Sequence, residues 1–293
     1  MFNVWCYWSQ GIDNLPLLIN LCIKSWKKNL GNDFKINILT KSIFLEIQCE
    51  YTETFFNLLT YQQQSDLIRL YLLYNYGGIW IDISTILVSD LSWVIDKFEM
   101  GYKQVGFYIN YPFCKKSKFL LENWFIAVNE PKNYIISCWK DAFNRILQES
   151  TKNGSIKHSQ LWKNTNKETI PIFSREYLSM HIANLWCIQN NTKYREQYIN
   201  TIYLYNGKST ALVCPLIDIQ SFVKGIGYKT NFPIIKFTNS NRKILKYCCS
   251  SRLRNILKNE TSNYYAYNPF FINMLILLAL IIIIIIYNII INS

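Results

Sequence analysis

The segment 65–82, SDLIRLYLLYNYGGIWID, constrains the fold of this chain more than any other stretch. Its apolar spacing predicts an amphipathic helix over 62–76, on which Asp66 and Arg69 lie three residues apart and leave from one face. Two glycines then turn the chain into a short apolar strand that ends just before Asp82. Ligands bind at the carboxyl ends of strands in open α/β sheets. Two carboxylates and a guanidinium should therefore meet at one site, which suits a polar, phosphorylated, metal-assisted substrate.

The segments around this one alternate between strand-like and helix-like patterns. Strands are predicted at 2–8, 34–39, 79–81 and 105–109, and helices at 16–30, 52–59, 118–128, 132–149 and 174–190, with a polar loop or lid at 151–169. Such alternation favours a mostly parallel sheet with helices packed against it. We therefore expect one α/β domain over residues 1–240.

Taken singly, the parts of the segment 65–82 have ordinary explanations. An Asp-Arg pair at this spacing is usually a solvated salt bridge, and a Gly-Gly pair after a helix is usually a turn. In this order, however, they resemble the signature of the DXD glycosyltransferases, which use sugar nucleotides. The nearest branch is the capsular polysaccharide synthesis type of family thirty-two. The yeast initiating mannosyltransferases and the large clostridial glucosylating toxins are more distant. Further resemblances lie at 4–11, 22–26, 122–127 and 235–238.

This resemblance implies a fold, a reaction and a first set of site residues. The fold would be GT-A-like, a single Rossmann-type nucleotide-sugar-binding domain. The reaction would transfer a sugar, with retention, from a UDP- or GDP-sugar to a glycan, lipid-linked or polysaccharide acceptor. Asp66 and Arg69 match the pair that holds the donor sugar. Asp82 matches the first Asp of the DXD motif, near the ribose and the metal. These three are the expected catalytic and donor-binding residues.

The expected cofactor is Mn²⁺ or Mg²⁺, and one departure from the family pattern bears on it. The DXD motif here reads Asp82-Ile83-Ser84, with serine where many relatives carry the second Asp. A hydroxyl ligates Mg²⁺ more weakly than a carboxylate does. The expected metal ligands are Asp82 and Ser84, with His181 as a third by resemblance. A lone histidine on an apolar helix is otherwise a hydrogen-bonded core residue.

Two further donor contacts are expected by resemblance. Trp8 lies where relatives stack a tryptophan on the base, and Trp5 is an alternative for the same role; either ring could equally belong to the core. Lys236, in the K-x-T block, would face the departing diphosphate. Its alternative reading is a basic, membrane-facing surface.

The positive charge of the chain gathers near its carboxyl end. The formal net charge is +12, and beyond Asp218 there are nine basic residues against Glu260 alone. The uncharged run 270–291 is 22 residues long, which as a helix spans about 33 Å and predicts a transmembrane helix. The basic segment 241–269 before it would lie at the membrane surface, with a basic helix at 241–258. By the positive-inside rule, the preceding domain would face the cytosol. No nucleic-acid motif accompanies the charge.

The amino terminus and the cysteines fit a cytosolic domain. Met1 leads directly into a predicted strand without a secretory signal pattern, and the nine cysteines show no disulfide-like spacing, so we expect them to be reduced.

The expected function is therefore a tail-anchored glycosyltransferase. The alternative is a catalytically inactive, membrane-anchored protein that binds a sugar nucleotide or a glycan. Ser84 favours this alternative, whereas the presence of Asp66, Arg69 and Asp82 argues against it.

Overall fold

A computed structural model describes residues 1–13, 15–108, 120–211 and 233–237 of the chain. The strands are β1 (Phe2–Tyr7), β2 (Phe34–Leu39), β3 (Gly78–Ile81), β4 (Thr85–Leu87), β5 (Gln104–Tyr108), β6 (Leu121–Val128), β7 (Ile202–Asn206) and β8 (Ile234–Lys236). The helices are α1 (Leu17–Asn29), α2 (Lys41–Ile47), α3 (Glu53–Asn57), α4 (Tyr61–Tyr76), α5 (Ser92–Glu99), α6 (Tyr134–Asn153), α7 (Gln160–Asn164), α8 (Ser179–Asn190), α9 (Thr192–Thr201) and α10 (Gly207–Thr210), with 3₁₀ turns η2 (Ile156–His158) and η3 (Ile172–Ser174).

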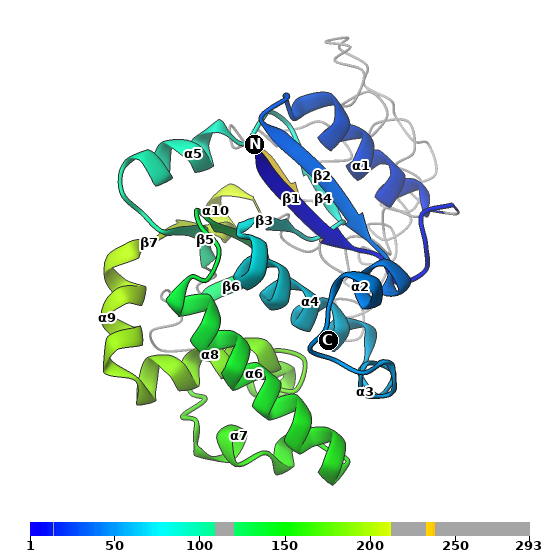
Figure 1. Cartoon of the computed structure of the whole chain (residues 1–293). Coiled ribbons are helices and arrows are strands. Elements are labelled where there is room, and N and C mark those ends of the chain that lie inside the picture. Colours follow the sequence, from blue (N-terminus) through cyan, green and yellow to red (C-terminus); the bar gives the residue numbers. More distant parts are fainter. Residues whose placement is uncertain (14, 109–119, 212–232, 238–293) are drawn as a thin grey trace, which may run out of the picture.

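Six of the strands form a mixed sheet in the order β2-β1-β3-β6-β5-β7. Strand β6 runs antiparallel to both β3 and β5, and the other three pairings are parallel. The expected mostly parallel sheet with helices against it is therefore confirmed. In Figure 1, helices α6 to α9 gather on one side of the sheet and α1 lies on the other. Strands β4 and β8 form a separate antiparallel pair.

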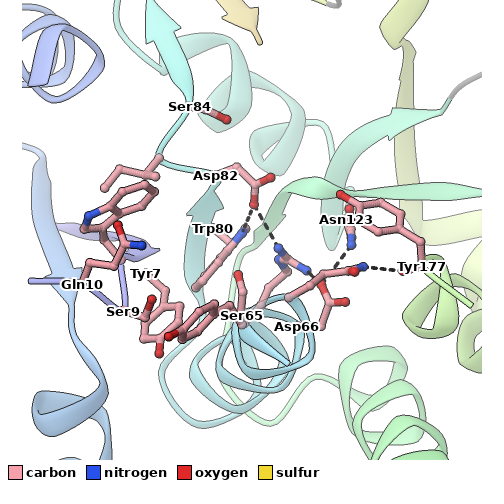
Figure 2. Close-up of a pocket in the computed structure, with 15 residues that line it drawn as sticks. Tyr7, Ser9, Gln10, Ser65, Asp66, Trp80, Asp82, Ser84, Asn123 and Tyr177 are labelled. Carbon is pink, nitrogen blue, oxygen red and sulfur yellow. Dashed lines mark hydrogen bonds and ion pairs between the residues drawn. The ribbon is translucent and has the colours of Figure 1, made fainter. Parts of the chain in front are cut away.

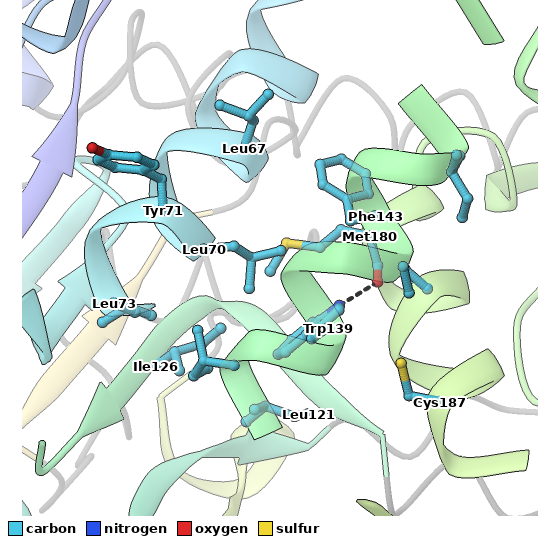
Figure 3. Packing of buried hydrophobic residues seen from close by; sticks show 14 of the residues in the cluster. Leu67, Leu70, Tyr71, Leu73, Leu121, Ile126, Trp139, Phe143, Met180 and Cys187 are labelled. Atoms are coloured by element: carbon cyan, nitrogen blue, oxygen red, sulfur yellow. Dashed lines mark hydrogen bonds between the residues drawn. The ribbon is translucent and has the colours of Figure 1, made fainter. Parts of the chain in front are cut away.

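The two faces of the sheet bury two hydrophobic clusters. Trp80 and Ile126 point to the cluster that α4, α6 and α8 complete, whereas Ile79 and Ile81 point to the cluster that α1 and α5 complete. This alternation follows from the two-residue period of a strand. Figure 3 shows the first cluster, in which Trp139 of α6 donates a hydrogen bond of 2.7 Å to the carbonyl of Met180 in α8.

The start of helix α4 and the turn from α4 into strand β3 are each fixed by local interactions. Thr60 accepts a hydrogen bond from the backbone of Gln63, whose side chain accepts from the backbone of Thr60, so a capping box starts α4. The two glycines that follow α4 have φ values of +64° and +89°. A Cβ on Gly78 would stand 2.4 Å from the carbonyl oxygen of Asn3. The turn that delivers Asp82 to the sheet edge therefore needs glycine.

Several local predictions are confirmed, among them β1, α1, β2 and α4. The predicted helix at 118–128 is wrong, because residues Leu121–Val128 form β6 in the middle of the sheet. That strand is buried on both faces, so its sequence LENWFIAV ends in a continuous apolar run and lacks the alternation of a half-buried strand. The loop predicted at 151–169 is interrupted by η2, which buries Ile156, and by α7, which buries Leu161 and Trp162.

No helix within the described ranges is both long and apolar enough to span a bilayer. The predicted transmembrane run 270–291 and the basic segment 241–269 lie outside the described residues.

Candidate functional site

The candidate site is a pocket of about 310 Å³ at the carboxyl ends of β1 and β3. This volume falls in the range of roughly 300–1,000 Å³ that small-molecule sites occupy. Figure 2 shows how its walls are assembled from segments far apart in the sequence. The lining comes from the end of β1 and the following turn (Tyr7, Trp8, Ser9, Gln10), from the first half of α4 (Tyr61, Gln62, Ser65, Asp66, Arg69), from β3 and the turn after it (Trp80, Asp82, Ile83, Ser84), and from Asn123 and Tyr177.

Asp66 and Arg69 form an ion pair within α4 that is almost completely buried, with side-chain exposures of 1% and 2%. The burial excludes the alternative of a solvated surface pair. Burial raises the pKa of the Asp66 carboxyl, and the Arg69 guanidinium opposes that rise. Asn123 of β6 donates a hydrogen bond of 3.0 Å to Asp66 Oδ1. The other oxygen, Oδ2, is buried and accepts no hydrogen bond from the described residues.

Asp82 lies directly after β3 and gathers three donors. Its Oδ1 accepts from Arg69 Nη2 at 2.9 Å and from the indole of Trp80 at 3.0 Å. Its Oδ2 accepts from Lys236 Nζ at 2.7 Å. Burial opposes ionisation, but the charges of Lys236 and Arg69 outweigh it and lower the pKa of Asp82 to about 2. The carboxylate is therefore ionised at neutral pH.

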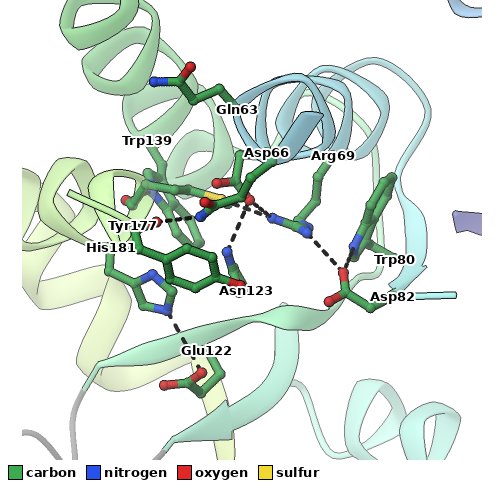
Figure 4. Close-up of polar contacts among 12 residues, drawn as sticks. Gln63, Asp66, Arg69, Trp80, Asp82, Glu122, Asn123, Trp139, Tyr177 and His181 are labelled. Carbon is green, nitrogen blue, oxygen red and sulfur yellow. Dashed lines mark hydrogen bonds and ion pairs between the residues drawn. The ribbon is translucent and has the colours of Figure 1, made fainter. Parts of the chain in front are cut away.

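Arg69 thus bridges two carboxylates through its two terminal nitrogens, Nη1 to Asp66 and Nη2 to Asp82 (Figure 4). Its guanidinium also lies 4.7 Å from the centroid of the Trp80 ring. A planar, forked cation is suited to such a bridge. The result is a chain of charges, carboxylate, guanidinium, carboxylate and ammonium, of which Asp66, Arg69 and Asp82 line the pocket and Lys236 contacts Asp82.

Lys236 reaches this chain from 154 residues away in the sequence. Strand β8 pairs antiparallel with β4, so that Lys236 stands opposite Thr85 and next to Ser84. Its Nζ lies 3.0 Å from Ser84 Oγ, and its side chain is only 10% exposed. The alternative of a basic surface lysine is excluded by this burial.

The two tryptophans of the amino-terminal strand have different surroundings. Trp8 lines the pocket. Trp5 is buried in the core, and its indole donates a hydrogen bond of 2.9 Å to the carbonyl of Gly77. Of the two candidates for base stacking, Trp8 is therefore the one at the site, and Trp5 supports the Gly-Gly turn.

His181 lies in α8, is fully buried and is not part of the pocket lining. Its Nε2 is 3.9 Å from Glu122 Oε2, and Figure 4 shows these two side chains facing each other. Neither ring nitrogen has a hydrogen-bond partner among the described residues. The structure does not bring His181 together with Asp82 and Ser84, and its metal role stays a prediction.

The described oxygens do not fit a dedicated Mn²⁺ or Mg²⁺ site. These ions take several oxygen ligands, of which carboxylates are the strongest. Both oxygens of Asp82 already accept from Arg69 or Lys236, and Ser84 Oγ contacts Lys236. The described part of the chain also holds no group of three His, Cys, Asp or Glu side chains suited to a metal ion. The predicted cofactor stays a prediction.

Trp80 and Asn123 are lining residues that donate hydrogen bonds to Asp82 and Asp66, and neither received a role from sequence. Trp80 could have been found, because residues two apart on a strand share a face and Trp80 precedes Asp82 by two. Asn123 could not, because its approach to Asp66 depends on β6 being a strand beside β3.

The fold and the site define a mixed α/β protein with a charged small-molecule pocket at the carboxyl edge of its sheet. Residues 2–217 match the family described as capsular polysaccharide synthesis protein, and the chain belongs to this family.

The chain is similar to three fungal proteins and to one solved structure. It is 31% identical over 178 residues to O-glycosyltransferase braB of Annulohypoxylon truncatum, covering 54% of this chain and 41% of that protein. It is 28% identical over 166 residues to glycosyltransferase afumC of Aspergillus fumigatus, covering 51% and 41%. For O-glycosyltransferase PaGT of Phomopsis amygdali the identity is 24% over 178 residues, covering 54% and 42%. The match thus spans about two fifths of the length of these relatives. The solved structure of PaToxG glycosyltransferase matches with 19% identity and a TM-score of 0.35, covering 68% of this chain and 83% of that one.

Proposed function

We propose that this protein is a glycosyltransferase with a GT-A-like fold. It would move a sugar from a UDP- or GDP-sugar to a glycan, lipid-linked or polysaccharide acceptor. The observation that carries the proposal is the buried chain Asp66–Arg69–Asp82 at the carboxyl edge of the sheet. Membership of the capsular polysaccharide synthesis family and the names of the fungal relatives support it.

In this proposal each site residue has a different role toward the donor. Asp66 Oδ2 is a buried acceptor that a sugar hydroxyl would satisfy, since a buried oxygen without a donor is costly. Arg69 holds Asp66 and Asp82 in fixed positions, so little reorganisation is needed when charge develops at the anomeric carbon. Lys236 adds positive charge beside the departing diphosphate.

The proposed reaction proceeds with retention and without a dedicated protein nucleophile. The bond from the anomeric carbon to the phosphate oxygen breaks, and a bond to the acceptor oxygen forms on the same face of the sugar. The acceptor hydroxyl proton passes to the departing diphosphate, which leaves as UDP or GDP. The transition state resembles an oxocarbenium ion, which the ionised Asp82 would stabilise.

The proposal is tested by incubating the full chain with a panel of UDP- and GDP-sugars, in Mn²⁺ and in EDTA, and measuring release of the nucleoside diphosphate. Slow hydrolysis of one donor is expected, because water replaces the missing acceptor. Donor binding without hydrolysis, with or without candidate acceptors, would favour the inactive binder that Ser84 raises. Neither binding nor hydrolysis would contradict the proposal.

Replacing Trp8 by leucine should weaken nucleotide binding by about two- to tenfold, because stacking on an aromatic ring contributes about 0.5–1.5 kcal/mol beyond simple burial. The matched variant is Trp5→Leu, which removes a core ring and its hydrogen bond to Gly77. It should lower the thermal unfolding midpoint and leave the affinity of the folded protein unchanged. Calorimetric titration of both variants with UDP and GDP measures the affinity of each for the nucleotide. A larger loss of affinity in Trp5→Leu would contradict the assignment.

We further propose that residues 270–291 attach the protein to a membrane with the preceding domain facing the cytosol. A charged residue in the middle of a transmembrane helix costs about 2.5–3.5 kcal/mol on insertion scales. Leu278→Arg combined with Ile283→Arg should therefore release the full chain from membranes during an alkaline wash, while the unchanged chain stays bound. An unchanged chain that washes off would contradict attachment. To test the orientation, protease is added to intact cells. The proposed orientation predicts that the domain is protected in intact cells and is digested once the cells are lysed.

A further inference from the structure

The position of Lys236 goes beyond a general positive charge near the pocket. Its ammonium lies between the two DXD-type side chains, 2.7 Å from Asp82 Oδ2 and 3.0 Å from Ser84 Oγ. We propose that this ammonium takes the place of the divalent cation, so that the protein binds a nucleoside diphosphate without a metal. The inference rests on the proposed function, because it concerns the same donor site.

The backbone around Lys236 holds it at this point from both sides. Its own N–H donates to the carbonyl of Ala211 at 2.8 Å. The next residue, Phe237, donates its N–H to the Ser84 carbonyl at 3.0 Å and accepts from Ser84 Oγ at 3.2 Å. Ser84 and Lys236 are thus positioned by one short ladder between β4 and β8. The ammonium is a fixed part of the site, unlike a surface lysine with free rotamers.

The charges at the site agree with such a replacement. Serine in place of an acidic residue at position 84 removes one negative charge, and Lys236 contributes one positive charge. Compared with the family pattern, in which the lysine of the K-x-T block is also present, the site therefore carries one negative charge fewer, and the Lys236 ammonium lies against the carboxylate that remains. Asp82, the remaining DXD carboxylate, is already neutralised by Lys236 and Arg69. A divalent ion that approaches the Asp82 carboxylate would meet two cations already in contact with it.

The same arrangement explains why Ser84 is more than a weakened metal ligand. Its hydroxyl donates a hydrogen bond to the Phe237 carbonyl and accepts one from Lys236 Nζ. A carboxylate at this position would have no proton for the Phe237 carbonyl and would bring two acceptors together. The serine therefore fits the lysine-containing site better than an aspartate would.

The inference is tested by calorimetric titration of the full chain, purified in mild detergent, with UDP and with GDP. Each titration is run once in EDTA and once in Mn²⁺. We expect the affinity of the bound nucleotide to agree within about threefold between the two conditions, which corresponds to less than about 1 kcal/mol. Binding that appears only with Mn²⁺, or that tightens by tenfold or more, would overturn the inference and leave the proposed function standing. No binding of either nucleotide under either condition would count against the proposed function itself.

The variant Lys236→Met adds a direct probe of the ammonium. In EDTA it should bind the nucleotide at least about tenfold more weakly, because an apolar side chain of similar length supplies no charge. The control is Lys103→Met, which removes a lysine paired with Glu130 at 3.1 Å before β5, at the opposite edge of the sheet. It should bind like the unchanged chain. Affinity of a folded Lys236→Met equal to that of the unchanged chain would overturn the inference, and if the variant does not fold, the EDTA comparison decides.

Discussion

Replacing Asp82 by asparagine is expected to lower donor turnover by at least about 100-fold. Asparagine keeps the size of the side chain but has one acceptor oxygen and an NH₂ group. Arg69, Trp80 and Lys236 all donate to Asp82, so one of these donors would face the NH₂ group. The negative charge of the carboxylate, which the proposed reaction uses to stabilise the transition state, would also be lost. The measurement is release of UDP or GDP from the donor that the unchanged protein hydrolyses.

The same variant has a stability effect that the sequence did not indicate. From the sequence alone, loss of Asp82 should leave the fold intact. In the structure Asp82 neutralises two buried cations, so Asp82→Asn should also lower the free energy of unfolding, by about 1–3 kcal/mol. Because the folded-state pKa of about 2 lies below the unfolded value of 3.8, this contribution is present above about pH 4 and is lost as the pH falls toward 2.

Two controls separate the catalytic effect of Asp82 from its effect on stability. Asp141→Asn, on the exposed side of α6, should change neither turnover nor stability. The double variant Asp82→Asn with Lys236→Met removes one unpaired cation, so it should regain stability without regaining turnover. Turnover of Asp82→Asn near that of the unchanged protein would remove Asp82 from the active site.

Replacing Arg69 by lysine is expected to raise the donor KM or lower kcat by at least about tenfold. Lysine keeps the charge but has one ammonium, which cannot reach Asp66 and Asp82 in the way that two guanidinium nitrogens do. The stacking over Trp80 would also be lost. One carboxylate would then lose its partner in a buried setting, so the thermal unfolding midpoint should fall as well. Steady-state kinetics on the hydrolysed donor measure the first effect.

The matched control for this variant is Arg145→Lys. Arg145 also pairs with a carboxylate, Glu149, at 3.0 Å, but on an exposed helix surface. Its replacement should leave kinetics and stability unchanged, because exposed ion pairs contribute little. Kinetics of Arg69→Lys equal to those of Arg145→Lys would mean that Arg69 does not act on the donor.

The part of the site that lies in one continuous segment could be predicted from the sequence. The helix spacing places Asp66 and Arg69 together, and the Gly-Gly turn leads to the strand that delivers Asp82. Both follow from local geometry. The approach of Lys236 depends on the pairing of β8 with β4, so it could be anticipated only through the family resemblance and not from spacing.

The remainder depends on tertiary structure that local patterns do not encode. Strand β6 was expected to be a helix because a strand buried on both faces carries no alternation, and with it the contact of Asn123 to Asp66 was missed. Helix α9 was missed because the polar sequence of Thr192–Thr201 buries only two side chains, Tyr194 and Tyr198. The choice between Trp5 and Trp8 required knowing that the Trp5 ring turns toward the carbonyl of Gly77.

The most direct test of the central claim, that the pocket at Asp66, Arg69 and Asp82 binds a sugar nucleotide, is a calorimetric titration of the full chain with individual UDP- and GDP-sugars. Binding of one donor with one site per chain, weakened by at least about tenfold in Arg69→Lys and unchanged in Arg145→Lys, is the predicted result. No binding of any donor by the folded protein, or binding that Arg69→Lys leaves unchanged, would contradict it.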